Sequence, residues 1–369
     1  MNTNWQNLPP KALTRTYGHY VAGLSTEEAL DAAGMNYKVI PLPLLAQGNS
    51  QNIKVDNHVA LYRSDARPTV AEPNPQPLAI ATKSYTVFQN AQILSIMKAA
   101  AEAAGVEIER LGEYDGGRRI WAVTTLKSDR ARAEISVGDI VALKLRMISG
   151  HEPGIALRIQ AIVERLTCLN GATSKRVKGS VSIAHRRALT MGDLQNIEAL
   201  YTSSIDDFNS YVEDARLLRD TPTNGIDTRL IVAELLAGSS AVDDIIGRQV
   251  PRARSANPGE TRGSYLQDMA RLIAARGATG LAYGDSVTTR TQNLLWDVVD
   301  ETERRQLGRD LALGTLWGTY NGVTSYINHR SGRTLDSGLE SAFVGNGSKT
   351  MEKAFDLITE FAAARQDAA

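Results

Sequence analysis

The sequence predicts an α+β fold, in which helices flank an antiparallel β-sheet core and a mainly helical C-terminal half follows. Two patterns indicate this class. Between residues 106 and 167, apolar side chains alternate with polar ones in segments joined in pairs by short turns, as in β-hairpins. After Asp220 they recur instead at helical spacing. A chain of 369 residues, 43% of them hydrophobic, can bury a substantial core and divide into more than one region.

Residues 1–57 are predicted to form an N-terminal arm. Ser25-Thr-Glu-Glu28 has the pattern of a capping box, in which the serine and the second glutamate cap the start of a short helix that Gly34 ends. Strand-like segments follow at residues 37–45 and 58–63.

Residues 58–220 are predicted to form the α+β core. An alanine-rich helix over residues 90–104 precedes two strands, 106–114 and 118–126, which Asp115-Gly-Gly117 joins as a hairpin turn. A second hairpin pairs residues 139–148 with 155–167, and a long helix over residues 191–218 closes the core.

The second hairpin predicts a sheet with one apolar and one cationic face. Successive side chains of a strand point to opposite faces. Val141, Leu143, Leu145 and Met147 therefore face one way, with Leu157, Ile159, Ala161 and Val163 beside them. The opposite face carries Lys144, Arg146, Arg158 and Gln160, and we expect it to present its three cations to solvent.

Residues 221–369 are predicted to be a helical C-terminal region. Helices are expected over residues 228–237, 264–276, 293–308, 310–329 and 349–365. The segment 247–263 has two prolines, one acid and four arginines (Arg248, Arg252, Arg254, Arg262), and this composition predicts a mobile basic loop.

Charge is strongly sorted along a chain that is neutral overall, with 41 Lys+Arg and 41 Asp+Glu. From Arg165 to Met191 there is no carboxylate. The cations of this segment are Arg165, Lys175, Arg176, Lys178, Arg186 and Arg187, with His185 among them. Residues 201–247 contain nine acids and three arginines. Such separation predicts that a polyanion binds at the basic segment, although a solvated loop that only aids solubility is the alternative.

Catalytic and metal-binding signatures are weak. Cys168 is the only cysteine, so an internal disulfide and a cysteine-based zinc site are excluded. The five histidines show no metal-ligand spacing, and no phosphate-binding loop or nucleophile elbow is present. We therefore expect no cofactor and no metal. The absence of a long apolar run and of a secretory signal predicts a cytoplasmic protein without a membrane segment.

Several aromatic residues have two interpretations. Trp317, Tyr320, Asn321 and Thr324 recur at helical spacing, which is more typical of a packing seam with a buried polar partner than of a ligand site. Trp121, Tyr114 and Tyr85 could stack on nucleic-acid bases, but the apolar neighbours of Trp121 favour a core position.

Three stretches resemble motifs of the phage/plasmid-like protein family catalogued as domain of unknown function 932. They are Lys83-Ser-Tyr-Thr-Val-Phe-Gln-Asn90, the passage from Ile159 to Asn170 followed by Ser182 to Arg186, and Leu316 to His329. The resemblance implies a gene carried by plasmids, phages and integrated elements, and it implies no established activity.

The leading hypothesis is a non-enzymatic single-stranded DNA-binding protein of the strand-annealing or DNA-processing type. The predicted core resembles that of single-strand-annealing recombinases at the level of fold alone. Phosphates would be held by Lys144, Arg146, Arg158, Arg165, Lys175, Arg176, Lys178, His185, Arg186 and Arg187. A homo-oligomer is expected, with an exonuclease or a single-strand-binding protein as a possible partner. The alternative is a structural or protein-interaction factor of a mobile element. A nucleic-acid or nucleotide enzyme is a third hypothesis.

Overall fold

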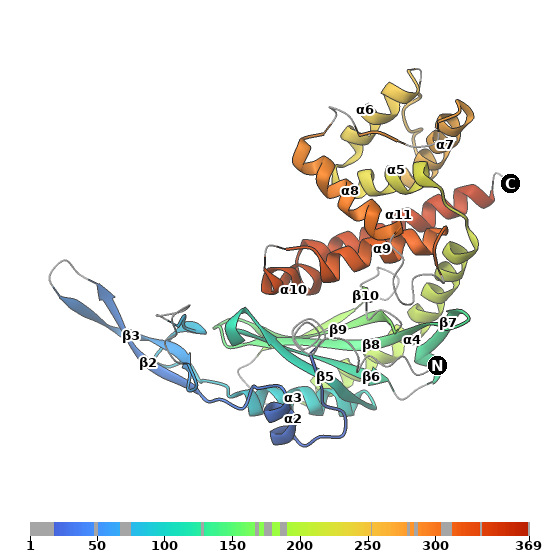
Figure 1. Cartoon of the computed structure of the whole chain (residues 1–369). Coiled ribbons are helices and arrows are strands. Elements are labelled where there is room, and N and C mark those ends of the chain that lie inside the picture. Colours follow the sequence, from blue (N-terminus) through green and yellow to red (C-terminus); the bar gives the residue numbers. More distant parts are fainter. Residues whose placement is uncertain are drawn as a thin grey trace.

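The structure is a computed structural model. It describes residues 18–47, 51–66, 75–126, 129–166, 170–172, 179–184, 190–251, 253–278, 281–283, 287–303, 312–332 and 334–367. The fold is α+β, as the sequence predicts, and the buried side chains form one continuous hydrophobic core. A large antiparallel sheet lies between helices below it and a stack of C-terminal helices above it, while a smaller sheet extends to one side (Figure 1).

The N-terminal elements confirm the predicted capping box and both predicted strands. α2 (Thr26–Ala32) starts at Ser25, whose hydroxyl accepts a hydrogen bond from the Glu28 backbone N–H, while the Glu28 carboxylate accepts one from the Ser25 N–H. The smaller sheet has the order β2-β3-β4. Its strands are β2 (Val39–Gln47), β3 (Asn52–Arg63) and β4 (Ala79–Thr82). The predicted boundary between residues 57 and 58 falls inside β3.

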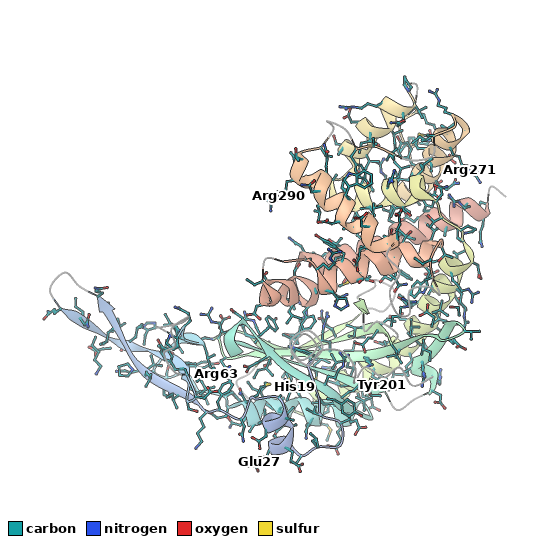
Figure 2. All side chains as sticks on the ribbon, in the orientation of Figure 1. His19, Glu27, Arg63, Tyr201, Arg271 and Arg290 are labelled. Carbon is teal, nitrogen blue, oxygen red and sulfur yellow. The ribbon has the colours of Figure 1, made fainter. Side chains whose placement is uncertain are left out.

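The base of this arm is tied to the larger sheet through Arg63, at the end of β3 (Figure 2). Its guanidinium lies 2.5 Å from the Glu113 carboxylate and 3.9 Å from the centre of the Tyr37 ring. The Tyr37 hydroxyl donates to the same carboxylate at 2.8 Å. The rest of the arm extends away from the body of the protein (Figure 1).

The larger sheet contains both predicted hairpins. Its main strand order is β1-β5-β6-β8-β9-β10, with β7 paired to β8 and β11 paired to β9. The strands are β1 (His19–Tyr20), β5 (Val106–Tyr114), β6 (Arg119–Leu126), β7 (Arg132–Ser136), β8 (Asp139–Gly150), β9 (Ala156–Arg165), β10 (Asn170–Ala172) and β11 (Ser180–Ala184). Every pairing is antiparallel. The alternating hydrophobic pattern therefore identified the central strands correctly.

Two helices cover the apolar face of this sheet. α3 (Asn90–Ala103) packs on β5 and β8, and α4 (Met191–Asp220) packs on β7, β8, β9 and β11. The α3 side chains that reach the core include Ile93, Leu94 and Met97. On β8, the side chains Val141, Leu143, Leu145 and Met147 are fully buried.

The C-terminal half is helical, as predicted. Its helices are α5 (Gly225–Leu236), α6 (Ser239–Gln249), α7 (Arg262–Ala275), α8 (Thr289–Glu303), α9 (Leu316–His329), α10 (Leu335–Phe343) and α11 (Asn346–Gln366). The sequence analysis did not predict α6 and α10, which are short. α9, α10 and α11 lie above the sheet, and α5 to α8 form the outer part (Figure 1).

The predicted basic loop 247–263 is shorter in the structure, where the described residues between Gln249 and Arg262 form no helix or strand. Its first residues complete α6 and its last two begin α7. Its arginines are also neutralised by carboxylates that are near in space. Arg254 lies 2.7 Å from Glu260 and 2.9 Å from Asp268. Arg262 lies 2.8 Å from both Glu234 and Asp243, and Arg248 pairs with Asp244. Arg252 lies outside the described residues.

Close packing between α8 and α9 depends on Gly322. A Cβ atom at Gly322 would lie 2.5 Å from Cα and Cγ2 of Thr302. We expect Gly322→Ala to lower the free energy of unfolding by about 1–3 kcal/mol, because a packed helix interface resists an added methyl group. Gly247→Ala in α6 is the control, since a Cβ there meets nothing within 4 Å. It should raise stability by up to about 1 kcal/mol in the same urea titration. Equal effects of the two variants would contradict the expectation.

Candidate nucleic-acid interface

The predicted polar face of the sheet exists, because the strand register places its residues side by side. Arg146 of β8 lies opposite Gln160 of β9 and opposite Val123 of β6. Lys144 and Arg158 belong to the same face, two residues along their strands. We call this surface, with Tyr114, Arg119 and Trp121 of the neighbouring strands, the polar sheet face.

The predicted exposure of Lys144 is wrong. Only 3% of this residue is exposed, and its Nζ lies 2.7 Å from the Glu109 carboxylate and 2.5 Å from that of Glu164. Arg110 forms a further ion pair with Glu164. Burial alone would raise the pKa of Glu164, but Arg110 and Lys144 lower it to about 2. Lys144 therefore belongs to an internal ion network and is not available to phosphates in this structure.

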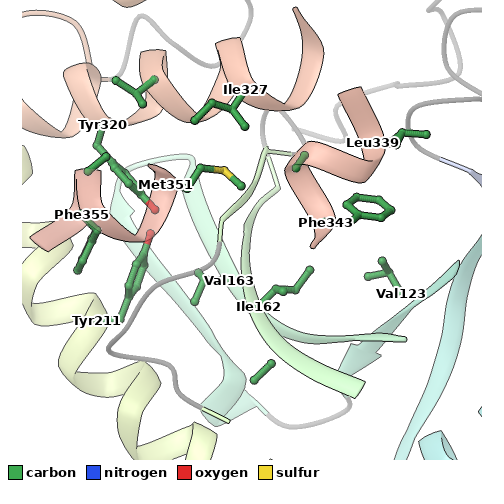
Figure 3. Packing of buried hydrophobic residues seen from close by; sticks show 14 of the residues in the cluster. Val123, Ile162, Val163, Tyr211, Tyr320, Ile327, Leu339, Phe343, Met351 and Phe355 are labelled. Carbon is green, nitrogen blue, oxygen red and sulfur yellow. The ribbon is translucent and has the colours of Figure 1, made fainter. Parts of the chain in front are cut away.

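Arg146 is buried as well, which corrects the second part of the prediction. Its Nη2 donates to the backbone oxygen of Phe343 at 2.9 Å, and its guanidinium lies 4.6 Å from the centre of the Phe343 ring. Because burial disfavours a charge, the pKa of Arg146 is lowered to about 10. Phe343 ends α10, so the cover over this cation comes from the C-terminal region (Figure 3).

Arg165 is the third predicted contact that proves to be internal. Its Nε and Nη2 donate to the two oxygens of Asp139, at 2.5 and 2.9 Å. The same carboxylate accepts a hydrogen bond at 2.9 Å from the indole Nε1 of Trp317. The pairing joins the first residue of β8 to the last residue of β9, and Trp317 links both to α9. Arg165 therefore has a structural role here.

Arg158 differs from these three cations because it is exposed. It lies on β9, opposite Ser182 of β11. The remaining predicted contacts lie outside the described residues; they are Lys175, Arg176, Lys178, His185, Arg186 and Arg187. The nucleic-acid-binding role of all these residues stays a prediction.

The strands next to the basic segment place its ends at one edge of the sheet. β10 ends with Ala172 opposite Val163 of β9, and β11 begins with Ser180 opposite Gln160. Val163 and Gln160 are separated by only two residues of β9. Residues 173–179 therefore connect two points of the sheet that lie close together. Three cations of the segment lie in this connection, and three more basic residues follow the end of β11.

The aromatic residues confirm the packing interpretation. Trp121, Trp317 and Tyr320 are each 1% exposed. The Asn321 side chain donates to the Trp317 backbone oxygen at 2.8 Å, which is the buried polar partner expected for the seam on α9. Tyr114 is also buried, and its hydroxyl donates to the Glu340 carboxylate at 2.5 Å.

The described residues contain no group of three or more His, Cys, Asp or Glu side chains that could hold a metal ion. A cavity of about 190 Å³ lies among α5, α8, α9 and α11 and is lined mainly by aliphatic side chains. Tyr326 is the one titratable residue of its lining, so the lining contains no acid–base pair.

The carboxylates that neutralise the polar sheet face were missed by the sequence analysis. Glu164 was the available signal, because it lies at a polar position of the alternating strand pattern, six residues after Arg158. Arg110 precedes Glu164 by 54 residues, and only the strand order brings the two together, whereas Lys144 lies on the paired strand of the predicted second hairpin.

Comparison with protein families identifies the chain. A family model described as "Domain of unknown function (DUF932)" matches residues 77–354, which are 278 of the 369 residues. The chain belongs to this family. The DUF932 match includes the larger sheet from β5 onward and the helices that cover it, and it excludes β2 and β3 of the arm. No curated protein and no solved structure matches the chain.

No helix in the described part of the DUF932 protein combines the length and the apolar character that crossing a membrane requires.

Proposed function

We propose that this DUF932 protein binds single-stranded DNA through its phosphates, as a strand-annealing-type recombination or DNA-processing protein of a phage or plasmid. The proposal includes a cytoplasmic location, a homo-oligomeric state and the possible exonuclease or single-strand-binding partner. No catalytic step is part of it.

One observation carries the proposal. The segment with Lys175, Arg176 and Lys178 connects β10 to β11, the two short strands that pair with β9 at one edge of the sheet; we call this the β9 edge, and Arg158 of β9 is exposed there. Between residues 166 and 190 the sequence has five lysines and arginines and no carboxylate. This composition contrasts with segment 247–263, whose described arginines are paired with acids. A segment that is rich in lysine and arginine and contains no carboxylate favours binding to the phosphates of a polyanion.

The buried cations limit the proposed interface. Lys144 and Arg165 are neutralised within the protein, and Arg146 is covered by α10. Phosphate binding is therefore assigned to Arg158 and to the cations between residues 173 and 187. Phosphate contacts position a strand without reading its sequence, so we expect affinity that depends little on base order.

The test is fluorescence anisotropy of a labelled single strand at rising salt concentrations. We expect affinity to fall with salt. The variant Lys175→Ala/Arg176→Ala/Lys178→Ala should bind more weakly. The slope of log affinity against log salt concentration should become less steep by about 2, because each lost phosphate contact of a single strand removes about 0.7 from the slope. The result would show that these cations contact phosphates.

A matched control removes three exposed cations elsewhere, Arg271, Arg290 and Lys349 (the first two are labelled in Figure 2). This variant should retain the wild-type salt dependence. Equal losses in both triple variants would mean that only total charge matters. Absence of binding by the wild-type protein at low salt would overturn the proposal.

The alternative is a protein-interaction factor, and exposed apolar side chains on the arm favour it. Leu42 of β2 and Ile80 of β4 lie on one face on either side of Ala60, and they are 41% and 53% exposed. Leu45 and Ile53, toward the end of the arm, are each 55% exposed. If no DNA binds, this function becomes the leading one.

A further inference from the structure

The polar sheet face contains an indole ring that lies flat on the sheet. Trp121 of β6 pairs with Gly112 of β5, and a Cβ atom at Gly112 would lie 2.7–2.9 Å from three adjoining atoms of the indole. A Cβ atom at Gly18 would lie 2.5 Å from another ring atom. Both glycines therefore allow the indole to rest on the neighbouring backbone. Its Nε1 is buried and has no hydrogen-bond partner among the described residues.

Arginines and a tyrosine surround this indole on the same face. Tyr114 pairs with Arg119, next to the Gly112–Trp121 pair, and Arg146 lies on the adjoining strand β8. The Nε atom of Arg146 is buried without a hydrogen-bond partner in the described part of the chain. Aromatic rings on which bases stack, with arginines that contact phosphates, form the usual surface for single-stranded nucleic acid.

α10 places one aromatic ring and one carboxylate on this surface. The Phe343 ring centre lies 5.5 Å from that of Trp121 and 6.1 Å from that of Tyr114, and both pairs meet edge to face. The Phe343 ring also packs against the Arg146 guanidinium, and the Glu340 carboxylate accepts a hydrogen bond from the Tyr114 hydroxyl. Figure 3 shows Phe343 reaching from its helix toward the sheet beside Val123. A nucleotide offers the same pair of groups, a planar ring and an anion.

We propose that the polar sheet face beneath α10 is a second binding site for single-stranded nucleic acid, which Phe343 and Glu340 occupy when the site is closed. One base would replace the Phe343 ring on Trp121, and one phosphate would take the position of the Glu340 carboxylate and accept the hydrogen bond of the Tyr114 hydroxyl. This inference rests on the proposed function, because it assumes a single strand held nearby at the β9 edge.

Two features favour displacement of α10 by such a ligand. The Trp121 Nε1 and Arg146 Nε donors have no hydrogen-bond partner among the described residues, and a buried donor without an acceptor is unfavourable. Phosphate oxygens and base carbonyls are acceptors for both. α10 is also only nine residues long, and helices of that length depend on packing for their stability.

The test compares two single strands of equal length and charge, oligo-dT and an abasic strand, in binding to the wild type and to Phe343→Ala/Glu340→Gln. The double variant removes both groups that occupy the site. We expect it to bind oligo-dT at least about fivefold more tightly than the wild type, the lower end for one stacked base. Affinity for the abasic strand should rise less than that for oligo-dT, because the abasic strand can place a phosphate in the site but has no base to stack on Trp121.

Phe361→Ala is the matched control, because Phe361 is fully buried in α11 and has no contact with the polar sheet face among those described. It removes an aromatic ring from the helical layer without uncovering the site, so it should leave the affinity for oligo-dT unchanged. If Phe361→Ala produces the same gain, loosening of the helical layer explains the effect and the inference is overturned.

The outcomes separate this inference from the proposed function. Salt-dependent binding by the wild type without a gain in the double variant overturns the second site and leaves the proposed function in place. Absence of binding by both proteins overturns both. If the double variant does not fold, hydrogen exchange of the wild type decides the question: oligo-dT should speed exchange in residues 335–343, and unchanged exchange at saturation overturns the inference.

Discussion

Replacing Asp139 with alanine is expected to lower the free energy of unfolding by about 3–5 kcal/mol. The Asp139 carboxylate is fully buried, and it pairs with both Nε and Nη2 of Arg165. Without it, the buried Arg165 guanidinium loses two charged hydrogen bonds and the Trp317 Nε1 loses this acceptor. Leaving one charge of a buried pair unpaired is among the most destabilising single changes. Urea unfolding followed by circular dichroism measures the loss.

Two further variants separate the charge from the hydrogen bond. Asp139→Asn keeps an oxygen that can accept a hydrogen bond from Trp317 but removes the charge. It should therefore be less stable than the wild type and more stable than Asp139→Ala. Trp317→Phe removes the indole donor and should cost about 1–3 kcal/mol, since the buried Asp139 oxygen loses a hydrogen bond. Asp206→Ala, an exposed acid on α4, should change stability by less than about 0.5 kcal/mol. An Asp139→Ala loss as small as that of Asp206→Ala would contradict this account.

The second large effect concerns Glu164 and the dependence of stability on pH. Its pKa is lowered from the ordinary 4.5 to about 2 in the folded protein. A carboxyl with a lowered folded-state pKa adds stability above its unfolded-state pKa, and this is lost as pH falls through the folded-state value. The contribution should therefore be complete above about pH 5, amount to about 3 kcal/mol, and disappear near pH 2.

Glu164→Gln tests this expectation. The variant cannot ionise, so it should be less stable than the wild type at pH 7, and the difference should shrink as the pH falls from about 5 toward 2. Urea titrations at a series of pH values give this difference directly. Glu102→Gln, an exposed acid on α3, is the control and should show a much smaller change. A wild-type advantage that stays constant down to pH 2 would rule out the ion network as its source.

The sequence predicted most of the fold because local patterns decide it. Alternation identified β5, β6, β8 and β9, since the core requires an apolar side chain at every second position of each strand. The capping box identified the start of α2 with no tertiary information. β10 and β11 were missed because strands of three and five residues are too short to show alternation.

The candidate site was predicted only in part. Alternation separates the two faces of a sheet, but it does not tell whether the polar face meets water or a second layer. Lys144 and Arg146 were assigned to solvent because their covering groups, Glu164 and Phe343, are respectively 20 and 197 residues away in the sequence. The exposed position of Arg158 agrees with the prediction, since it lies toward the β9 edge.

The order of the layers along the chain has a consequence for synthesis. The last strand of the larger sheet ends at Ala184, whereas α10, which covers the polar sheet face, spans Leu335–Phe343. At about 5–20 residues per second, a ribosome needs about 8 to 30 s to proceed from one to the other. The sheet can therefore form while Trp121 and Arg146 still face solvent. We therefore expect the nascent protein to keep this face uncovered until α10 has been synthesised.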